Sequence, residues 1–251
     1  MNPSLNHNQR GEPSGRMASP LLASTRAVLA FDADDTLWDC QTYFDEAERQ
    51  MSQLLKRFGE RRTIADELYQ TERKNISLTG FGCKAFILSM IETALRVSNH
   101  QLSGEEMAKV MEAGRQTLLL PATPLPGVEQ TLQYLSDTGK FRMILFTKGE
   151  LLDQQNKLQR SGLGRFFEEV YIVSDKTEEE YRHLCRQEGI QPEQLTMVGN
   201  SFKSDIQPVL QLGGRGFYIP FHATWQLEQT EEYDHPQLVR LQQFADLQHY
   251  F

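Results

Sequence analysis

The sequence has few cysteines and no long apolar segment. Its three cysteines, Cys40, Cys83 and Cys185, lie far apart and show no Cys-x-x-Cys or His/Cys metal-ligand spacing, which is typical of reduced thiols in a cytosol. No apolar run reaches the ~18 residues of a membrane span, and the N-terminus lacks the apolar stretch of a secretory signal. We therefore expect a cytoplasmic protein with no membrane segment.

A block of basic residues interleaved with aromatics is also missing. The chain carries 26 lysines and arginines against 34 aspartates and glutamates, a formal net charge of −8, so binding to a nucleic-acid backbone is not expected. A small anionic substrate would instead need a local positive site. The 251 residues, 39% of them hydrophobic, suit one sizeable core with a smaller insertion.

The chain divides into parts with different patterns. Residues 1–24 are rich in Asn, Ser, Pro and Gly without periodicity and predict a disordered leader. Residues 42–120 carry only helical patterns and predict an all-helical insertion, bounded by the proline-rich stretch 121–126. Residues 25–41 and 121–251 are then expected to form the core.

Helix signals recur through the insertion. Apolar residues from Phe44 to Phe58 keep helical spacing, which Gly59 interrupts. Residues 85–97 predict a mostly apolar helix. Two further helices are expected to open with capping boxes, at Thr63–Asp66 and at Ser103–Glu106.

From Gly127 onward, helices and strands alternate. The strands are expected at residues 141–146, 169–173, 195–198 and 216–219. Such alternation indicates a parallel sheet with crossover helices, because parallel neighbours need a long connection between them. The expected fold class is therefore α/β.

The most informative motif follows the apolar run 27–31 and reads Asp32-Ala33-Asp34-Asp35-Thr36-Leu37. In an extended segment, residues i and i+2 point to the same side, and ligands of open α/β sheets bind beyond the carboxyl ends of the strands. Asp32 and Asp34 can then serve as nucleophile and general acid/base. The structural alternative is an Asp-rich turn in which Asp35 and Thr36 cap the next segment.

Two other strand ends carry residues suited to a phosphoryl group. Residues 143–146 run into Thr147-Lys148-Gly149, which offers a hydroxyl and backbone N–H groups before a helix, a natural seat for an anion; alternatively, Thr147 caps that helix. The strand 169–173 is followed by Lys176, and Thr177 with Glu180 could cap the helix after it. A lone lysine in such a place is otherwise a surface residue.

The last motif is Gly199-Asn200-Ser201-Phe202-Lys203-Ser204-Asp205, which follows the strand 195–198. The glycine permits a tight turn, and Asn200 and Asp205 offer two hard oxygen ligands. This donor set suits Mg²⁺, which takes few protein carboxylates and keeps its waters. Asp205 could also act as an N-cap before Ile206, and the two roles are compatible.

The order of these four motifs resembles that of the haloacid dehalogenase-like (HAD) superfamily, from Ala27 to the C-terminus. The resemblance implies a Rossmann-like three-layer core with a helical cap inserted after the first motif. It marks Asp32 as the nucleophile and Asp34 as the acid/base. It also marks Thr147 as the phosphoryl anchor, Lys176 as the charge clamp and Asp205 as a metal ligand.

Two residues depart from the superfamily pattern. Asp35 stands where the second aspartate is usually followed by glycine, so the backbone there must accept a side chain. Asn200 stands where the fourth motif usually has aspartate; it keeps an oxygen ligand but removes one negative charge. We therefore expect weaker metal binding than in the superfamily pattern.

The resemblance implies a Mg²⁺-dependent phosphatase that hydrolyses a small phosphorylated metabolite through an aspartyl-phosphate. The expected ligands of Mg²⁺ are Asp32, the backbone carbonyl of Asp34, Asp205 and Asn200. Dehalogenases of the superfamily generally lack the second aspartate, which Asp34 supplies here. The alternatives are a phosphosugar mutase with the same carboxylate pair and a non-catalytic protein that binds a phosphorylated ligand.

Substrate selection is expected in the insertion. The Gly-flanked loop 79–84 carries Phe81 and Lys84, which could reach a substrate held at Thr147 and Lys148; alternatively, the loop only connects two helices and Phe81 lies in their core. Trp225 is expected to pack rather than to catalyse. The identity of the metabolite and the oligomeric state have no signature in the sequence.

Overall fold

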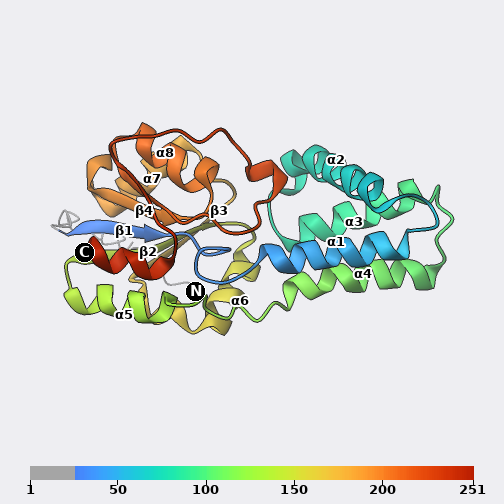
Figure 1. Cartoon of the computed structure of the whole chain (residues 1–251), viewed down its shortest axis with the longest axis horizontal. Helices are drawn as coiled ribbons and strands as arrows, with labels where there is room; N and C mark the ends of the chain where they lie inside the picture. The colour runs from blue at the N-terminus through green and yellow to red at the C-terminus, as the bar shows by residue number, and fades with distance from the viewer. Residues whose placement is uncertain (1–25) are drawn as a thin grey trace, which may run out of the picture.

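A computed structural model describes residues 26–251, so the leader expected at residues 1–24 lies outside the described residues. Its centre is a six-stranded sheet in which every neighbouring pair is parallel, in the order β3-β2-β1-β4-β5-β6 (Figure 1). The strands are β1 Ala27–Phe31, β2 Phe141–Lys148, β3 Glu169–Val173, β4 Leu195–Gly199, β5 Arg215–Tyr218 and β6 Leu238–Arg240. The predicted α/β class is confirmed.

Helices cover both faces of the sheet, because alternate side chains of the buried strands face opposite sides. On one face, α5 (Val128–Thr138) packs its apolar stripe against β1 and β2, near α6 (Leu151–Ser161). On the other face lie α7 (Glu178–Glu188) and the short α8 (Gln207–Gln211). The three layers make the Rossmann-like core that was predicted.

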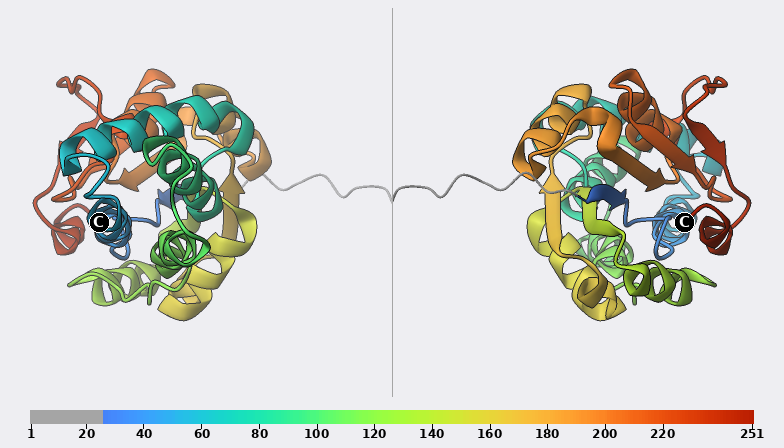
Figure 2. Two further views of the ribbon diagram at one scale, coloured as in Figure 1. Left: turned by 90° about the vertical axis from the view of Figure 1, so that its right-hand side faces the viewer. Right: turned by 90° about the vertical axis from the view of Figure 1, so that its left-hand side faces the viewer.

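Four helices between β1 and α5 pack around a hydrophobic cluster of their own. They are α1 Gln41–Leu54, α2 Arg61–Thr79, α3 Cys83–Val97 and α4 Gly104–Leu118. Figure 1 shows them beyond the tip of β1, and the left view of Figure 2 shows them in front of the sheet. Their role as a separate cap with the bounds 42–120 stays a prediction. None of the helices within residues 26–251 is both long and apolar enough to cross a membrane.

Some local predictions hold and others are wrong. Ser103 caps α4 in a complete capping box with Glu106. Thr63 caps nothing, because α2 already begins at Arg61 after an extended Glu60. Helix α1 ends at Leu54, before the Gly59 stop that was expected. The edge strand β6 was missed, since three partly exposed residues carry no alternating pattern.

The loop after β1 ties the sheet to the helical cluster. Asp35 has a φ of 63°, the left-handed conformation that usually requires glycine. Its Oδ1 accepts hydrogen bonds of 2.8 Å from the backbone N–H groups of Cys40 and Gln41, at the start of α1. The capping role considered for Asp35 is therefore real. It is compatible with the role predicted for Asp32 and Asp34.

Glycine at the end of β4 makes room for a side chain of the fourth motif. A Cβ atom built on Gly199 would lie 2.3 Å from Oδ2 of Asp205 and 2.6 Å from its Cβ. Asp205 is almost completely buried, and its carboxylate is held by Lys176 Nζ on one oxygen and by Ser201 N–H on the other. Gly199 thus allows the Asp205 carboxylate to lie directly over the end of the strand.

Gly199→Ala should therefore destabilise the protein by about 1–3 kcal/mol, the usual cost of overpacking a close-packed site. Gly104→Ala is the matched control, because a Cβ at Gly104 would meet nothing within 4 Å. Urea unfolding of both variants measures the difference. Equal stabilities for the two would show that Asp205 can move aside without cost.

Candidate active site

The four motifs converge on one cavity. It has a volume of about 180 Å³ and lies where the carboxyl ends of β1, β2 and β4 face the helices α1 to α3. Its lining includes residues from every motif. They are Asp32, Asp34, Thr147, Lys148, Lys176, Asn200 and Asp205. Parallel strands bring their carboxyl ends to one edge of a sheet, which is why motifs far apart in the sequence meet here.

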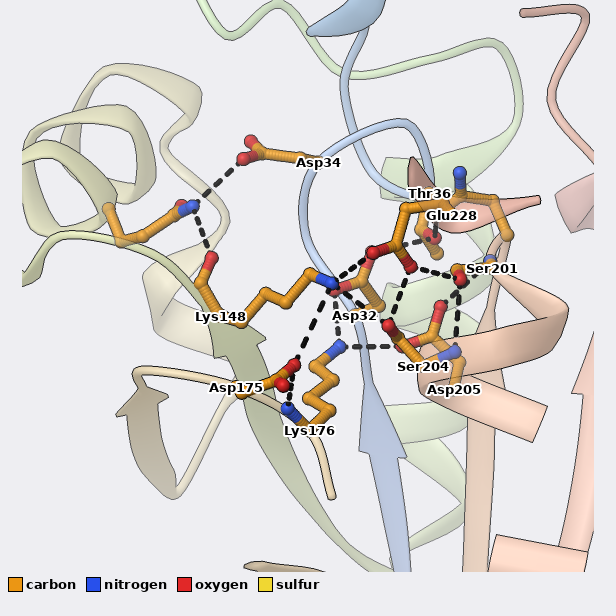
Figure 3. Close-up of polar contacts among 12 residues, drawn as sticks. Asp32, Asp34, Thr36, Lys148, Asp175, Lys176, Ser201, Ser204, Asp205 and Glu228 are labelled. Atoms are coloured by element: carbon orange, nitrogen blue, oxygen red, sulfur yellow. Dashed lines mark hydrogen bonds and ion pairs between the residues drawn. The ribbon is translucent and has the colours of Figure 1, made fainter. Parts of the chain in front are cut away.

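A buried cation lies between two carboxylates at the closed end of this cavity (Figure 3). Lys176 Nζ is 2.5 Å from Asp32 Oδ1 and 2.6 Å from Asp205 Oδ1. Lys176 is only 3% exposed, which contradicts the alternative that it is a surface lysine. Burial lowers the pKa of Lys176, but the two carboxylates outweigh that effect and raise it. Lys176 therefore stays charged.

The Asp32 carboxyl group differs from an exposed aspartate in its pKa and in its hydrogen-bond partners. Burial and the neighbouring negative charge of Asp205 raise its pKa to about 7, although Lys176 opposes this. Thr36 Oγ1 donates to Asp32 Oδ2 over 3.1 Å. Asp32 is thus held by a cation on one oxygen and by a hydroxyl on the other.

The backbone of the fourth motif fixes Asp205. Ser201 N–H donates to Asp205 Oδ2 over 2.9 Å. Ser201 also caps the short turn Phe202–Ile206, since its hydroxyl accepts from Ser204 N–H. The expectation that Asp205 is an N-cap is therefore wrong, because its carboxylate points to Lys176 instead.

Several oxygen atoms gather around the side chain of Asn200. In the amide orientation that satisfies its neighbours, the Asn200 nitrogen donates to Thr36 Oγ1 at 3.0 Å, to the carbonyl of Asp34 at 3.1 Å and to Asp32 Oδ2 at 3.3 Å. Asn200 is thus in contact with two of the predicted metal ligands. With the amide turned the other way, its carbonyl oxygen faces these two ligands and accepts from Thr36 Oγ1 over 3.0 Å, and in that orientation it completes the predicted set together with Asp205.

This donor set fits Mg²⁺. Within residues 26–251, no group of three or more His, Cys, Asp or Glu side chains gathers as in an all-protein metal cage. Mg²⁺ does not need one, because it binds through one or two carboxylates and completes its coordination with water and phosphate oxygens. Two carboxylates, a backbone carbonyl and an amide oxygen meet that requirement.

The Asp34 carboxylate turns away from Asp32 toward helix α6 (Figure 3). It accepts hydrogen bonds of 2.8 Å from Trp38 Nε1, Gln154 Nε2 and Lys157 Nζ. Burial raises the pKa of Asp34, but Lys157 and these hydrogen bonds outweigh it and lower the pKa. β1 ends at Phe31, so the two-residue period that would place both carboxylates on one side does not extend to Asp34.

Lys157 was not predicted as a site residue. Its side chain is buried and also forms a 3.0 Å ion pair with Asp153, one helical turn earlier. In the sequence this pair looks like an ordinary i,i+4 ion pair on an exposed helix face. No signal in the sequence distinguishes it from such a pair.

Thr147 and Lys148 end β2 and line the cavity. Helix α6 begins only at Leu151, after Glu150, so the alternative that Thr147 caps it is wrong. Lys148 Nζ forms an ion pair with Glu228, a residue that the sequence did not indicate, and donates to Ser204 Oγ over 2.9 Å. The positive charge of Lys148 at the cavity is therefore already paired with the Glu228 carboxylate.

The two predicted residues of the loop 79–84 lie in different surroundings. Phe81 lines the cavity and packs edge-on against Trp225, with 5.8 Å between ring centroids. It is outside the helical core, which contradicts the alternative of a buried linker residue. Lys84 is exposed, forms an ion pair with Glu150 and is absent from the lining. The substrate contact predicted for Lys84 stays a prediction.

Comparison with known proteins agrees with this geometry. Glyceraldehyde 3-phosphate phosphatase from Methanothermobacter thermautotrophicus is 29% identical over 189 residues, which cover 71% of this chain and 79% of that protein. The enzyme of the same name from Methanopyrus kandleri is 27% identical over 194 residues, covering 75% and 81%.

Among solved structures, a haloacid dehalogenase-like family hydrolase from Xanthomonas campestris superposes with a TM-score of 0.79 at 30% identity, covering 89% of this chain and 90% of that one. Residues 27–213 match the haloacid dehalogenase-like hydrolase family, a stretch that begins at β1, includes all four motifs and ends just after α8. This chain therefore belongs to the haloacid dehalogenase-like hydrolase family.

Proposed function

We propose that this chain is a Mg²⁺-dependent phosphatase that hydrolyses small phosphate monoesters through a covalent intermediate on Asp32. The observation that carries the proposal is the buried Lys176 between Asp32 and Asp205 at the closed end of the cavity. A nucleophilic carboxylate beside a fixed positive charge is suited to attack on an anionic phosphoryl group. The names of the two archaeal relatives support a small phosphorylated substrate.

In the first step, Asp32 attacks phosphorus in line with the ester oxygen. Thr147 binds a phosphoryl oxygen, and Lys176 offsets charge that would otherwise repel the carboxylate. Bound Mg²⁺, held by Asp32, Asp205, the Asp34 carbonyl and Asn200, would supply further charge neutralisation. Attack transfers the phosphoryl group to Asp32 and releases an alkoxide, which needs a proton.

Asp34 is suited both to protonate the leaving oxygen and to deprotonate the attacking water, with its side chain in a different position for each step. The ionised form that Lys157 stabilises is the form that deprotonates the water attacking the aspartyl-phosphate. Protonation of the leaving oxygen requires Asp34 to leave the Lys157 contact and carry a proton. We therefore propose that the Asp34 side chain turns from α6 toward the substrate during turnover.

The surroundings of the thiols fit an intracellular enzyme. All three cysteines are free and buried. Buried reduced thiols suit a reducing compartment, and we propose that the enzyme works in the cytoplasm.

Asp32→Asn should reduce phosphate release to background for every substrate, because the amide cannot act as the nucleophile. Released phosphate is measured over a panel of sugar phosphates, nucleotides and glycolytic intermediates with and without Mg²⁺. Asp137→Asn, an exposed change on α5, is the matched control. Equal rates for the wild type and Asp32→Asn would contradict the phosphatase, and an isomerised phosphosugar without free phosphate would show a mutase instead.

Asp34→Asn should slow hydrolysis of an alkyl phosphate by about 10²–10⁴-fold, the usual contribution of general acid–base catalysis. The loss on 4-nitrophenyl phosphate should be smaller, because its leaving group needs no proton. The ratio of kcat/KM values on the two substrates measures the difference, because kcat/KM reports the first step and does not include the water attack that both substrates share. Equal losses on both would contradict the role of Asp34 as a general acid.

Asn200→Asp should lower the Mg²⁺ concentration needed for half-maximal rate, because a hard cation gains most from a charged oxygen. The added charge lies near the incoming phosphoryl group, so kcat should be unchanged or lower. Titration of Mg²⁺ against initial rate decides the question, with the exposed Asn99→Asp as a charge-matched control. An activation constant that stays the same or rises would place Asn200 away from the ion.

A further inference from the structure

The chain segment after β5 enters the cavity from a side that the four motifs do not cover. Residues 223–225 and Glu228 belong to the lining, together with Phe81 from the loop between α2 and α3. We call residues 222–228 the strap. In Figure 1 the chain after β5 runs as an orange-red turn between the sheet and α2.

One end of the strap is fixed to the catalytic loops. Glu228 accepts hydrogen bonds of 2.6 Å from the hydroxyl groups of Ser201 and Ser204, and it forms an ion pair with Lys148 (Figure 3). Lys203 Nζ donates to the carbonyl of Leu227 over 2.7 Å. The Glu228 side chain is only 12% exposed. Charged hydrogen bonds at such a buried place hold a segment strongly.

The other end of the strap reaches the helical cluster. Trp225 lies close to the Glu72 carboxyl group of α2. Burial raises the pKa of Glu72 to about 8, and the Trp225 side chain opposes this rise. The Trp225 ring meets Phe81 at an angle of 82°. The ammonium group of Lys148 lies 4.0 Å from the centroid of the same Phe81 ring. Trp225 and Phe81 thus form an aromatic wall in the cavity that holds Asp32 and Thr147.

We propose that Trp225 is a specificity-determining residue, which with Phe81 contacts the organic group of the substrate, and that Glu228 is the positioning residue that holds Trp225 in place. The assignment rests on the proposed function, because it takes the phosphoryl group to lie at Asp32. The favoured substrate class is a phosphate monoester whose organic group is a single ring. The cavity of about 180 Å³ also has to hold the phosphoryl group, which limits the organic group to a small one. A ring is favoured because aromatic pairs gain free energy beyond that of their buried area.

Two non-hydrolysable probes separate the ring contact from the phosphoryl contact. Phenylphosphonate and methylphosphonate share the anionic group and differ in the ring, and isothermal titration calorimetry with Mg²⁺ gives the Kd of each. The wild type should bind phenylphosphonate more tightly. Trp225→Ala should raise the Kd of phenylphosphonate by roughly 3- to 10-fold, the range expected for the loss of one aromatic contact. The Kd of methylphosphonate should be unchanged. Trp225→Phe should retain most of the preference.

Two more variants complete the test. Glu228→Gln should lower the ratio of the methylphosphonate Kd to the phenylphosphonate Kd, as Trp225→Ala does. The ratio is compared because Glu228→Gln also frees Lys148 and therefore alters the binding of both phosphonates. Tyr134→Ala removes an exposed aromatic of α5 that is absent from the cavity lining, and it should change neither Kd.

The outcomes distinguish this assignment from the proposed function. Equal affinity of the wild type for the two phosphonates, or equal weakening of both by Trp225→Ala, would overturn the aromatic wall even in an active phosphatase. A preserved phenyl preference without any phosphate release would overturn the phosphatase and support the wall. Binding of neither phosphonate would overturn both.

Discussion

The site depends on one buried interaction, the contact of the Lys176 ammonium group with the Asp32 and Asp205 carboxylates. Without that cation, two buried carboxylates would face each other at the ends of β1 and β4. Removing one partner from a buried ion pair commonly costs about 3–5 kcal/mol, because an uncompensated charge remains. The same contact therefore joins three strand ends and holds the carboxyl group of the proposed nucleophile, Asp32. One negative charge is left over, which favours an additional cation at this place.

The sequence predicted this part because each of its residues follows an apolar run that forms a strand. Apolar runs before Asp32, Thr147, Lys176 and Asp205 indicated strands, and parallel topology brings the ends of such strands together. The central position of β1, between β2 and β4, then places Asp32 in the middle of the group. Local sequence patterns were enough to predict this contact, because the parallel sheet brings residues that are far apart in the sequence to the same edge.

The parts that escaped prediction depend on side chains whose partners are distant in the chain. Lys157 contacts Asp34 across 123 positions, and Glu228 contacts Lys148 across 80. Neither residue adjoins an apolar run, so composition and periodicity are silent about both. The orientation of the Asp34 carboxylate was missed for the same reason. It is set by donors of α6 and Trp38, not by the strand that precedes it.

Asp35 shows how one departure from the family pattern is stabilised. A non-glycine residue in a strained backbone region costs of the order of 1–3 kcal/mol. Burial raises the pKa of Asp35 to about 7, so each of its hydrogen bonds is taken at the ordinary value of about 0.5–1.5 kcal/mol. Its two bonds to the start of α1 can therefore offset the strain. Glycine at this position would remove both. Because Asp34 is the adjacent residue, a shift of α1 relative to the sheet would also displace the proposed acid/base. The helices that line the cavity are thereby linked to the proposed proton transfer.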